Sequence, residues 1–454
     1  MKPQNFEERV IWYAIVGTYG LYLIGGQPII VPAIAWLLAL YACKKIWEQK
    51  QMCGELVPGF KLRTKSNSSS QNNKIIIPLT TWLWISCIFI VLIGIVIAHL
   101  DFNAGTDRLF KSILKWFREF ALWGLFPLIG CLNIRPQLLY RAACIICLQS
   151  LILIPIFLLA FVLRLPSGAL YVSPLHYLGG NHPDLYSVVL YFFDAETNLP
   201  RLTFFAPWCP NLAIIAMIYF FLCRQESNKK WRFIGMIGST AMIVATVSRL
   251  AVLSLPIIIL LTWILTNFSL PIIHFTAGLV TFITSIFATQ LSNFFEVFVE
   301  KFNGARASSS QVRIQLVHLS LEKWWSDAPI WGHGFTEAKG PPIVFFLPIG
   351  TSGCGTWVNL LYTKGLVGFL VFVIPFVWTF VDLLNKAQKS VTARVGLSVV
   401  LVFFFFSFIE ELDLLSYIYW PGILMIGIAL REQVQASKSV VMNAKQLTQL
   451  KVGN

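Results

Sequence analysis

Long apolar segments alternate with short polar ones along nearly the whole chain. A helix needs about 20 apolar residues to cross the hydrocarbon core of a bilayer. The pattern therefore predicts an all-α, polytopic integral membrane protein with about twelve transmembrane helices. The predicted spans are Val10–Gly25, Ile29–Cys43, Ile75–Leu100, Ile113–Leu132, Ala142–Leu163, Pro207–Cys223, Phe233–Val247, Leu250–Phe268, Leu270–Leu291, Leu366–Leu384, Val395–Ile409 and Leu414–Leu430.

The basic residues predict how these spans are oriented. If the N-terminus is cytoplasmic and the spans alternate, most of the 35 Lys and Arg residues fall in inner segments, including Lys44, Lys45, Arg135 and Arg141. Short cytoplasmic loops carry an excess of Lys and Arg in membrane proteins. We therefore expect both termini in the cytoplasm. No small-residue cleavage site follows the first apolar stretch, so we expect a retained span and not a removed signal peptide.

Composition supports this interpretation. Hydrophobic residues make up 57% of the 454 residues and charged residues only 12%, whereas soluble domains carry about 25% charged residues. We expect one membrane domain over residues 1–454 instead of several soluble domains. The net charge of +14 is spread between apolar segments, and no nucleic-acid motif occurs, so we expect no nucleic acid partner.

Two long outer loops are predicted, over residues 164–206 and 292–355. Loops of this length in a compact membrane protein are usually functional. The second loop contains Gln311–Trp325, where apolar residues recur at helical spacing with charges on the opposite face. This pattern predicts an amphipathic helix in the periplasmic loop, on or near the outer membrane surface.

Three arginines are predicted at the outer face: Arg201, Arg249 and Arg313. Arg249 interrupts a nearly continuous apolar run, where a charge is costly unless it faces a cavity or an anion. A guanidinium group presents a planar fork of donors that suits phosphate oxygens. Three of them around one cavity would suit a pyrophosphate. The alternative is that each arginine reaches the interface or pairs with a carboxylate.

The remaining polar residues suggest less chemistry. His176, His182, His318 and His333 fall in the outer loops, and each is more typical of a structural role than of catalysis. The acidic group Glu410, Glu411 and Asp413 ends the eleventh predicted span, where it could face a cavity or balance an arginine. The outer carboxylates and the nine cysteines show no metal-ligand spacing, so we expect no metal and no cofactor.

Four pieces of the chain together resemble the O-antigen ligase and polymerase superfamily of bacterial envelope glycosyltransferases. The pieces are Arg201–Asn211 (RLTFFAPWCPN), Thr246–Arg249 (TVSR), Arg313–Trp325 with Ala328–Gly334 (APIWGHG), and Cys354–Gly368 (CGTWVNLLYTKGLVG). The resemblance lies in their order, spacing and common outer placement over the C-terminal two thirds of the chain.

The resemblance implies a metal-independent glycosyltransferase of the bacterial inner membrane, with about twelve spans and both ends inside. Its substrate would be an undecaprenyl-pyrophosphate-linked oligosaccharide, used at the periplasmic face. Arg201, Arg249 and Arg313 would hold the pyrophosphate. Membrane lipid and other polysaccharide-export proteins are the implied partners.

One position departs from the family pattern. The histidine usual in the last motif is Cys354 here. The general-base role could pass to His333, His318, Glu337 or Cys354 itself, or this protein could dispense with that base. A disulfide between Cys209 and Cys354 would remove the thiol from such a role, and an oxidising outer compartment permits that pairing.

The functional hypothesis is a polymerase of lipid-linked repeat units of an exopolysaccharide, capsule or O-antigen. An O-antigen ligase that transfers glycan to the lipid A core is the nearest alternative. A transporter of lipid-linked sugar is the second alternative, although we find no internal repeat and no charge cluster near the membrane midplane of the kind that transporters show.

Overall fold

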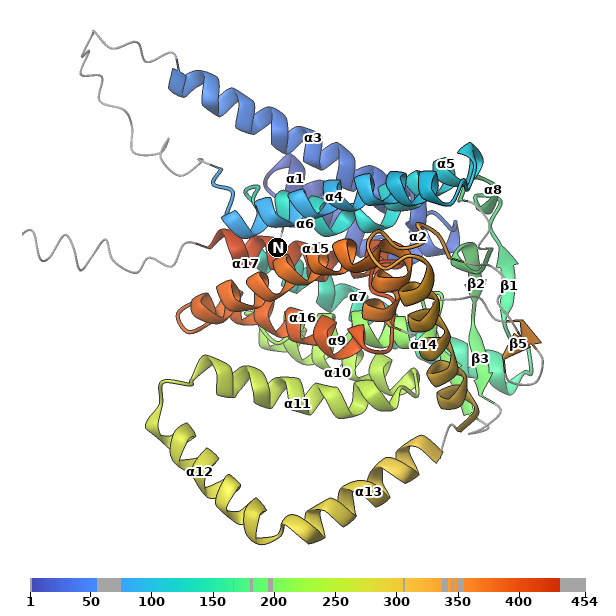
Figure 1. Cartoon of the computed structure of the whole chain (residues 1–454). Helices are drawn as coiled ribbons and strands as arrows, with labels where there is room; N and C mark the ends of the chain where they lie inside the picture. Colours follow the sequence, from blue (N-terminus) through green and yellow to red (C-terminus); the bar gives the residue numbers. More distant parts are fainter. Residues whose placement is uncertain are drawn as a thin grey trace, which may run out of the picture.

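The computed structural model describes residues 2–54, 75–165, 167–179, 183–194, 199–304, 307–336, 342–343, 347–348 and 355–432. Most helices run side by side in one bundle, and the strands gather at one end of it (Figure 1). The helices of the N-terminal half are α1 (Phe6–Val16), α2 (Thr18–Leu23), α3 (Gln27–Gly54), α4 (Leu79–Asp101), α5 (Thr106–Lys115), η2 (Trp116–Phe120), α6 (Leu122–Gly130), α7 (Pro136–Val162), α8 (His176–Gly179) and η3 (Pro183–Tyr186).

The C-terminal half continues the bundle. Its helices are α9 (Cys209–Cys223), α10 (Lys229–Ala245), α11 (Arg249–Thr266), α12 (Pro271–Ile286), α13 (Ala288–Gly304), α14 (Ala307–Asp327), α15 (Thr356–Ala387), α16 (Val391–Ser407) and α17 (Ser416–Arg431). Helix α14 includes the predicted helix Gln311–Trp325, so that prediction of helix is confirmed. Helices α12 and α13 form an arm that stands away from the bundle (Figure 1).

The expected all-α architecture needs one addition. Residues 164–206 contain two antiparallel hairpins, β1 (Ala169–Val172) with β2 (Ser187–Val189) and β3 (Tyr191–Asp194) with β4 (Leu199–Leu202). A third pair, β5 (Pro342–Ile343) with β6 (Leu347–Pro348), follows α14. The polar, Gly- and Pro-containing segments between helices thus form short hairpins, whose internal ladders satisfy their backbone groups.

Within the described residues, five helices are long and apolar enough to cross a membrane. They are Gln27–Gln49, Leu79–Asp101, Pro136–Val162, Arg249–Thr266 and Thr356–Ala387. The pair Pro271–Ile286 and Ala288–Val297, bent by 83°, would make a sixth. The protein is therefore a multi-pass membrane protein, while the number of twelve stays a prediction.

Helices α6 and α17 cross at a pair of glycines. A Cβ on Gly130 would lie 2.6 Å from the backbone carbon of Gly427, and a Cβ on Gly427 would lie 2.6 Å from the Cα of Pro127. Small residues let helix backbones approach this closely in membrane proteins. The stacked rings of Phe126 and Trp420, with centroids 5.2 Å apart, lie in the same interface. The crossing sets the start of α17 against η2, where Ser416 donates a hydrogen bond to the Glu119 carbonyl.

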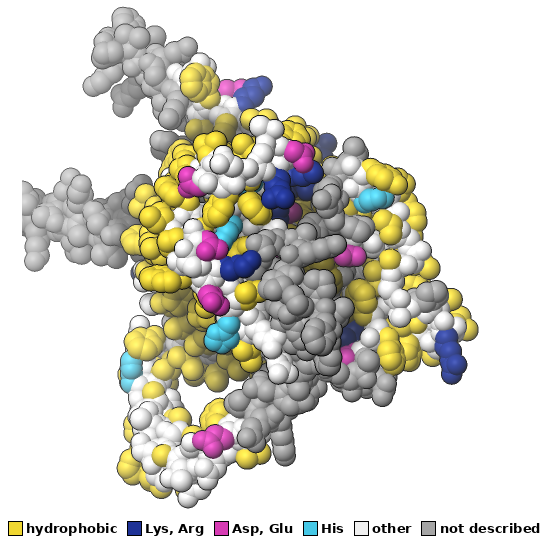
Figure 2. Space-filling model, turned by 45° about the vertical axis from the view of Figure 1, so that its right-hand side comes forward, with side chains coloured by type: hydrophobic (Ala, Val, Ile, Leu, Met, Phe, Trp, Pro, Cys, Tyr) yellow, Lys and Arg dark blue, Asp and Glu magenta, His cyan; other side chains and the backbone are white. Residues whose placement is uncertain are grey.

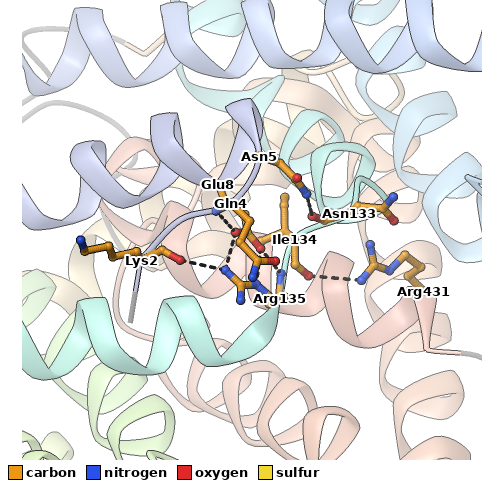
Figure 3. A network of polar contacts seen from close by, with 8 residues as sticks. All are labelled: Lys2, Gln4, Asn5, Glu8, Asn133, Ile134, Arg135 and Arg431. Carbon is orange, nitrogen blue, oxygen red and sulfur yellow. Dashed lines mark hydrogen bonds and ion pairs between the residues drawn. The ribbon is translucent and has the colours of Figure 1, made fainter. Parts of the chain in front are cut away.

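A polar network closes the bundle end that lies away from the hairpins (Figure 3). Arg135 binds the buried Glu8 carboxylate with two hydrogen bonds of 2.7 Å, from Nε and Nη2. Burial alone would raise the pKa of Glu8, but the Arg135 hydrogen bonds hold it below its ordinary value. Arg431 at the end of α17 donates to the carbonyl of Ile134 at 3.2 Å. The network thus joins the N-terminal segment, the turn before α7 and the end of α17.

The glycine crossing yields a prediction about stability. Gly427→Ala forces the α6 and α17 backbones apart, and we expect a loss of about 1–3 kcal/mol, typical of overpacking. Gly278→Ala on the exposed α12, where nothing lies within 4 Å of the new Cβ, serves as the control. Thermal unfolding in detergent should show a lower Tm for the first variant alone. Equal Tm values would contradict the importance of the crossing.

Candidate functional site

Charged and histidine side chains gather at the hairpin end of the bundle, whereas apolar side chains cover its flank (Figure 2). An apolar flank is what lipid requires, and ionisable groups in such a protein mark functional positions by default. This end of the bundle is therefore the candidate functional site, and it includes the arginines that the sequence singles out.

Arg201 connects the hairpin β3–β4 to the corner between α10 and α11. Its Nε donates to the carbonyl oxygen of Thr246 at 3.0 Å. The next residue, Val247, has φ 51°, and a β-branched side chain in this left-handed region is strained. Such strain persists only where the surroundings impose it, often at functional sites. The strained corner ends at Arg249, the half-buried first residue of α11.

Arg313 reaches the same region from α14. Its Nη1 donates to the Ile409 carbonyl at 3.0 Å, and its Nη2 lies 3.5 Å from Glu410 Oε1. The Glu410 carboxylate also interacts electrostatically with Arg201. The structure thus brings two of the three predicted arginines to one carboxylate. It also confirms the expectation that the acidic group could balance an arginine.

Glu410 belongs to the turn Phe408–Leu415 between α16 and α17. Thr356 at the start of α15 anchors this turn, because its hydroxyl donates to the Glu410 carbonyl at 2.7 Å and accepts from the Leu412 amide at 3.0 Å. Gly355, at φ 92°, packs against the Phe408 carbonyl, which a Cβ would meet at 2.6 Å. The turn is therefore held rigidly against α15.

Helix α15 is broken at Gly365, whose φ is 64° and ψ −170°. The segment after α14 enters the break and satisfies its backbone groups. His333 and Gly334 donate to the carbonyls of Tyr362 and Thr363, at 2.9 and 2.8 Å, while the amides of Leu366 and Val367 donate to Pro329 and Ile330, at 2.9 and 3.1 Å. Two sequence pieces that carry the family resemblance, Ala328–Gly334 and Cys354–Gly368, therefore meet in space over their described residues.

Side chains of α15 that precede the break line a cavity of about 280 Å³. Lys364 pairs there with Asp413 at 2.8 Å, and both side chains are nearly buried. Asn359 donates to the other oxygen of Asp413 at 3.4 Å. Helix α5 and η2 also line the cavity and contribute Lys115 and Glu119. The Phe408–Leu415 turn thus lies between the arginines on one side and this cavity on the other.

The cavity side chains from α5 and η2 were missed by the sequence reasoning. Lys115, Arg118 and Glu119 lie inside the predicted span Ile113–Leu132 and were treated as part of an apolar helix. Three charges within five residues of such a span indicate a functional position, and this signal is visible in the sequence. The π-helical turn η2, in which the Ala121 amide donates to the Trp116 carbonyl at 2.9 Å, was not foreseeable from spacing. Turns of this kind recur at functional sites.

The carboxyl groups of the Phe408–Leu415 turn differ in the direction in which their pKa values are shifted. Burial, together with the Asp413 carboxylate, raises the pKa of Glu411 to about 7, although Lys115 and Lys364 oppose the change. For Asp413, burial alone would raise the pKa, but Lys364 outweighs it and the pKa is lowered. Neighbouring groups with separated pKa values are typical of acid–base sites.

An apolar groove of about 920 Å³ reaches the corner between α10 and α11, where Val247 lines it, and none of the three arginines is among its lining residues. It lies between α7, α9, α10 and β4, and Thr240 is the polar residue among its otherwise apolar lining. The groove follows α10 from Phe233 to Val247, about 20 Å at the rise of a helix. Pro200 and Leu202, on either side of Arg201, line its end. The groove thus reaches the α10–α11 corner, whose Thr246 carbonyl accepts a hydrogen bond from Arg201 Nε.

The other predicted site residues are two histidines and a cysteine within the described residues, and three residues outside them. His333 is buried and stacks between Phe102 and Tyr362, with ring centroids at 5.1 and 4.3 Å. His318 lines a hollow of about 350 Å³ together with Arg313. Cys209 is buried. Cys354, Glu337 and His182 lie outside the described residues, so the roles proposed for them remain predictions. Among the described residues, no group of three or more His, Cys, Asp or Glu is arranged to hold a metal ion.

Comparison with known proteins supports the resemblance. Residues 234–373 match the family model described as O-Antigen ligase. The match runs from α10 into α15, so it includes Arg249, Arg313 and the break at Gly365, while Arg201, α5 and η2 lie outside it. No curated protein matches this chain.

The ion pair of the cavity gives a second prediction. Lys364→Met leaves the Asp413 carboxylate buried without its cation, and breaking a buried pair in this way costs about 3–5 kcal/mol. We expect a clear fall in Tm in detergent, and recovery of most of it in Lys364→Met/Asp413→Asn, where the charge is removed as well. A single variant as stable as the wild type would show that the pair is not structural.

Proposed function

We propose that this multi-pass membrane protein, whose residues 234–373 match the family model described as O-Antigen ligase, polymerises lipid-linked repeat units at the periplasmic face. The repeat unit would be carried on undecaprenyl pyrophosphate. The product would be an exopolysaccharide, capsule or O-antigen.

The observation that carries this proposal is that the apolar groove reaches the arginine corner, which we define as the α10–α11 corner with Arg249 and with Arg201 bound to the Thr246 carbonyl. A polyprenyl pyrophosphate has a long apolar tail and a compact, doubly charged head. The groove along α10 suits the tail, and it ends at Pro200 and Leu202, between which Arg201 lies. Arg249 and Arg313, which the sequence pieces also single out, complete the proposed head-group site. A guanidinium group suits phosphate because it offers paired donors and keeps its charge.

The proposed reaction is a displacement at the anomeric carbon of the donor glycan. A hydroxyl oxygen of the acceptor sugar forms the new glycosidic bond, and the bond from the anomeric carbon to the pyrophosphate oxygen breaks with its electron pair. The leaving pyrophosphate gains negative charge in the transition state. Preorganised cations that stabilise such developing charge usually supply the largest catalytic term, so the arginines would perform the chemistry without a metal ion.

Transfer of finished glycan to the lipid A core is the second candidate, because the matched family model is described as O-Antigen ligase. The same donor site would serve both reactions. They differ in the acceptor, so a deletion strain separates them: loss of a polymerase leaves single repeat units, whereas loss of a ligase leaves long chains that are not attached to lipid A core.

The arginine site leads to a third prediction. In a deletion strain that expresses each variant, Arg201→Ala and Arg249→Ala should lose polymer almost completely, because one stabilising donor is worth about 10²–10³ in rate. Arg→Lys at either position should recover little, because lysine lacks the planar fork. Arg224→Ala, an exposed change at the other end of α9, is the control. Chain-length analysis of surface glycan, with immunoblots of membrane fractions, is the measurement. Full-length polymer with Arg249→Ala would defeat the proposal.

The groove leads to a fourth prediction. Ala241→Trp places an indole among the groove residues, so it should weaken carrier binding and shorten the polymer while the protein still inserts. Val252→Trp adds the same ring at a position that is 51% exposed on α11, outside the groove, and should have wild-type polymer. If the two variants behave alike, the groove does not hold the carrier tail.

A further inference from the structure

The cavity beneath η2 is separate from the arginine corner but shares the Phe408–Leu415 turn with it. Its volume of about 280 Å³ is just below the range of about 300–1,000 Å³ for small-molecule sites. Its walls combine polar groups from α5, η2, α15 and the turn with the rings of Trp116, Phe120 and Phe335. Apolar walls with a few polar groups that converge from several elements are typical of ligand sites.

Glu119 is a carboxylate that lines this cavity. Unlike Asp413, it makes no direct ion pair with a lysine among the described contacts. The residue is 6% exposed and lines the cavity. Its backbone is fixed by the hydrogen bond that Ser416 donates to its carbonyl oxygen. The π-helical turn η2 carries it into the same cavity lining as Lys364 and Asp413. The carboxylate is therefore buried, positioned and directed at a space large enough for a ligand.

Cations around Glu119 offset the cost of burying its charge. The carboxylate interacts with Lys115, Arg118 and Lys364, and it is repelled by Asp413. The hydroxyls of Tyr186 and Tyr417 also lie within electrostatic reach of it. Burial favours the protonated form and the cations favour the ionised form. A group balanced in this way can both accept and release a proton, which is the requirement for a general base.

A second observation points to a hydroxyl-bearing ligand. Asn359 is 4% exposed, and its Oδ1 has no hydrogen-bond partner among the described residues. An acceptor left unsatisfied when buried costs about 1–3 kcal/mol, and such groups in a native fold call for an explanation such as an absent ligand. Asn359 lines the cavity from the wall of α15. With the amide turned toward the cavity, a sugar hydroxyl that donates to Oδ1 would satisfy it.

Resting on the proposed function, we propose that this cavity binds the acceptor sugar and that Glu119 is the general base for its attacking hydroxyl. The O–H proton passes to a Glu119 oxygen as the hydroxyl oxygen bonds to the anomeric carbon of the donor. The electron pair of the broken C–O bond leaves with the polyprenyl pyrophosphate at the arginine corner. Glu119 then releases its proton to solvent. The shared turn sets the distance between the two sugars.

The test uses the full-length protein, purified in detergent, with polyprenyl-pyrophosphate-linked oligosaccharide extracted from the deletion strain as the probe. Glu119→Gln keeps the shape of the side chain but cannot accept the proton. We expect its polymerisation rate to fall about 100-fold or more, in line with the contribution of general-base catalysis. Binding of the probe should stay near that of the wild type. Glu48→Gln, the same change in an exposed pair with Lys44, is the control.

Glu119→Asp guards against misfolding, since it keeps the charge that Lys115 and Arg118 face. It should fold with a wild-type Tm and still lose at least about tenfold in rate, because the shorter side chain withdraws the oxygen from the hydroxyl. Asn359→Leu should raise the acceptor concentration that gives half the maximal rate more than it lowers the maximal rate itself. Together the three variants separate a catalytic role from a structural one.

The outcomes distinguish the two proposals. If wild-type protein elongates the probe and Glu119→Gln does so within threefold of that rate, the base assignment is overturned while the polymerase proposal stands. If Glu119→Gln loses probe binding and rate together, Glu119 acts in donor binding or folding, and the assignment is again overturned. If wild-type protein elongates nothing, the proposed function itself fails.

Discussion

The close crossing of α6 and α17 is the constraint on which the rest of the site depends. Gly130 and Gly427 let the backbones of α6 and α17 touch. This contact fixes the position of α17, and therefore of its first residues, relative to α6. The residues just before α17 form the Phe408–Leu415 turn, and Ser416 binds the backbone of η2 directly. A wider crossing would separate η2 from the acidic turn and open the cavity between them. The packing of the α6 backbone against the α17 backbone thus helps to position the charged side chains of η2 and of the Phe408–Leu415 turn.

Charge in this protein is arranged by the cost of removing it from water. At one end of the bundle the charges are matched: Arg135 binds Glu8 with two hydrogen bonds, and Arg141 binds Glu226 in the same bidentate manner. At the other end the arginines outnumber the carboxylate they share, because both Arg201 and Arg313 interact with Glu410. The matched pairs hold helices together. The second group is the one that we propose to bind an anionic ligand.

Irregular backbone is concentrated beside the proposed site. The break of α15 at Gly365, the π-helical turn η2 and the left-handed Val247 each lie next to a charged group that the proposals use. In a membrane protein, irregular backbone is tolerated where protein or a water-filled cavity surrounds it. At the α15 break the segment Pro329–Gly334 supplies the missing partners. The fold therefore accepts local strain beside the charged groups that the proposals use.

Sequence by itself determined the membrane class and most of the helices, because the hydrocarbon core imposes a length and a polarity that a single segment must satisfy alone. The predicted spans Ile75–Leu100 and Ala142–Leu163 correspond closely to α4 and α7. It also singled out Arg201 and Arg313, which the structure shows to interact with the same Glu410 carboxylate. Only the tertiary structure decided that Glu119, Asn359 and Lys364 share one cavity. Their positions depend on a π-helical turn, a broken helix and a glycine crossing, which arise from contacts between segments up to 300 residues apart along the chain and leave no periodic signal in any one of them.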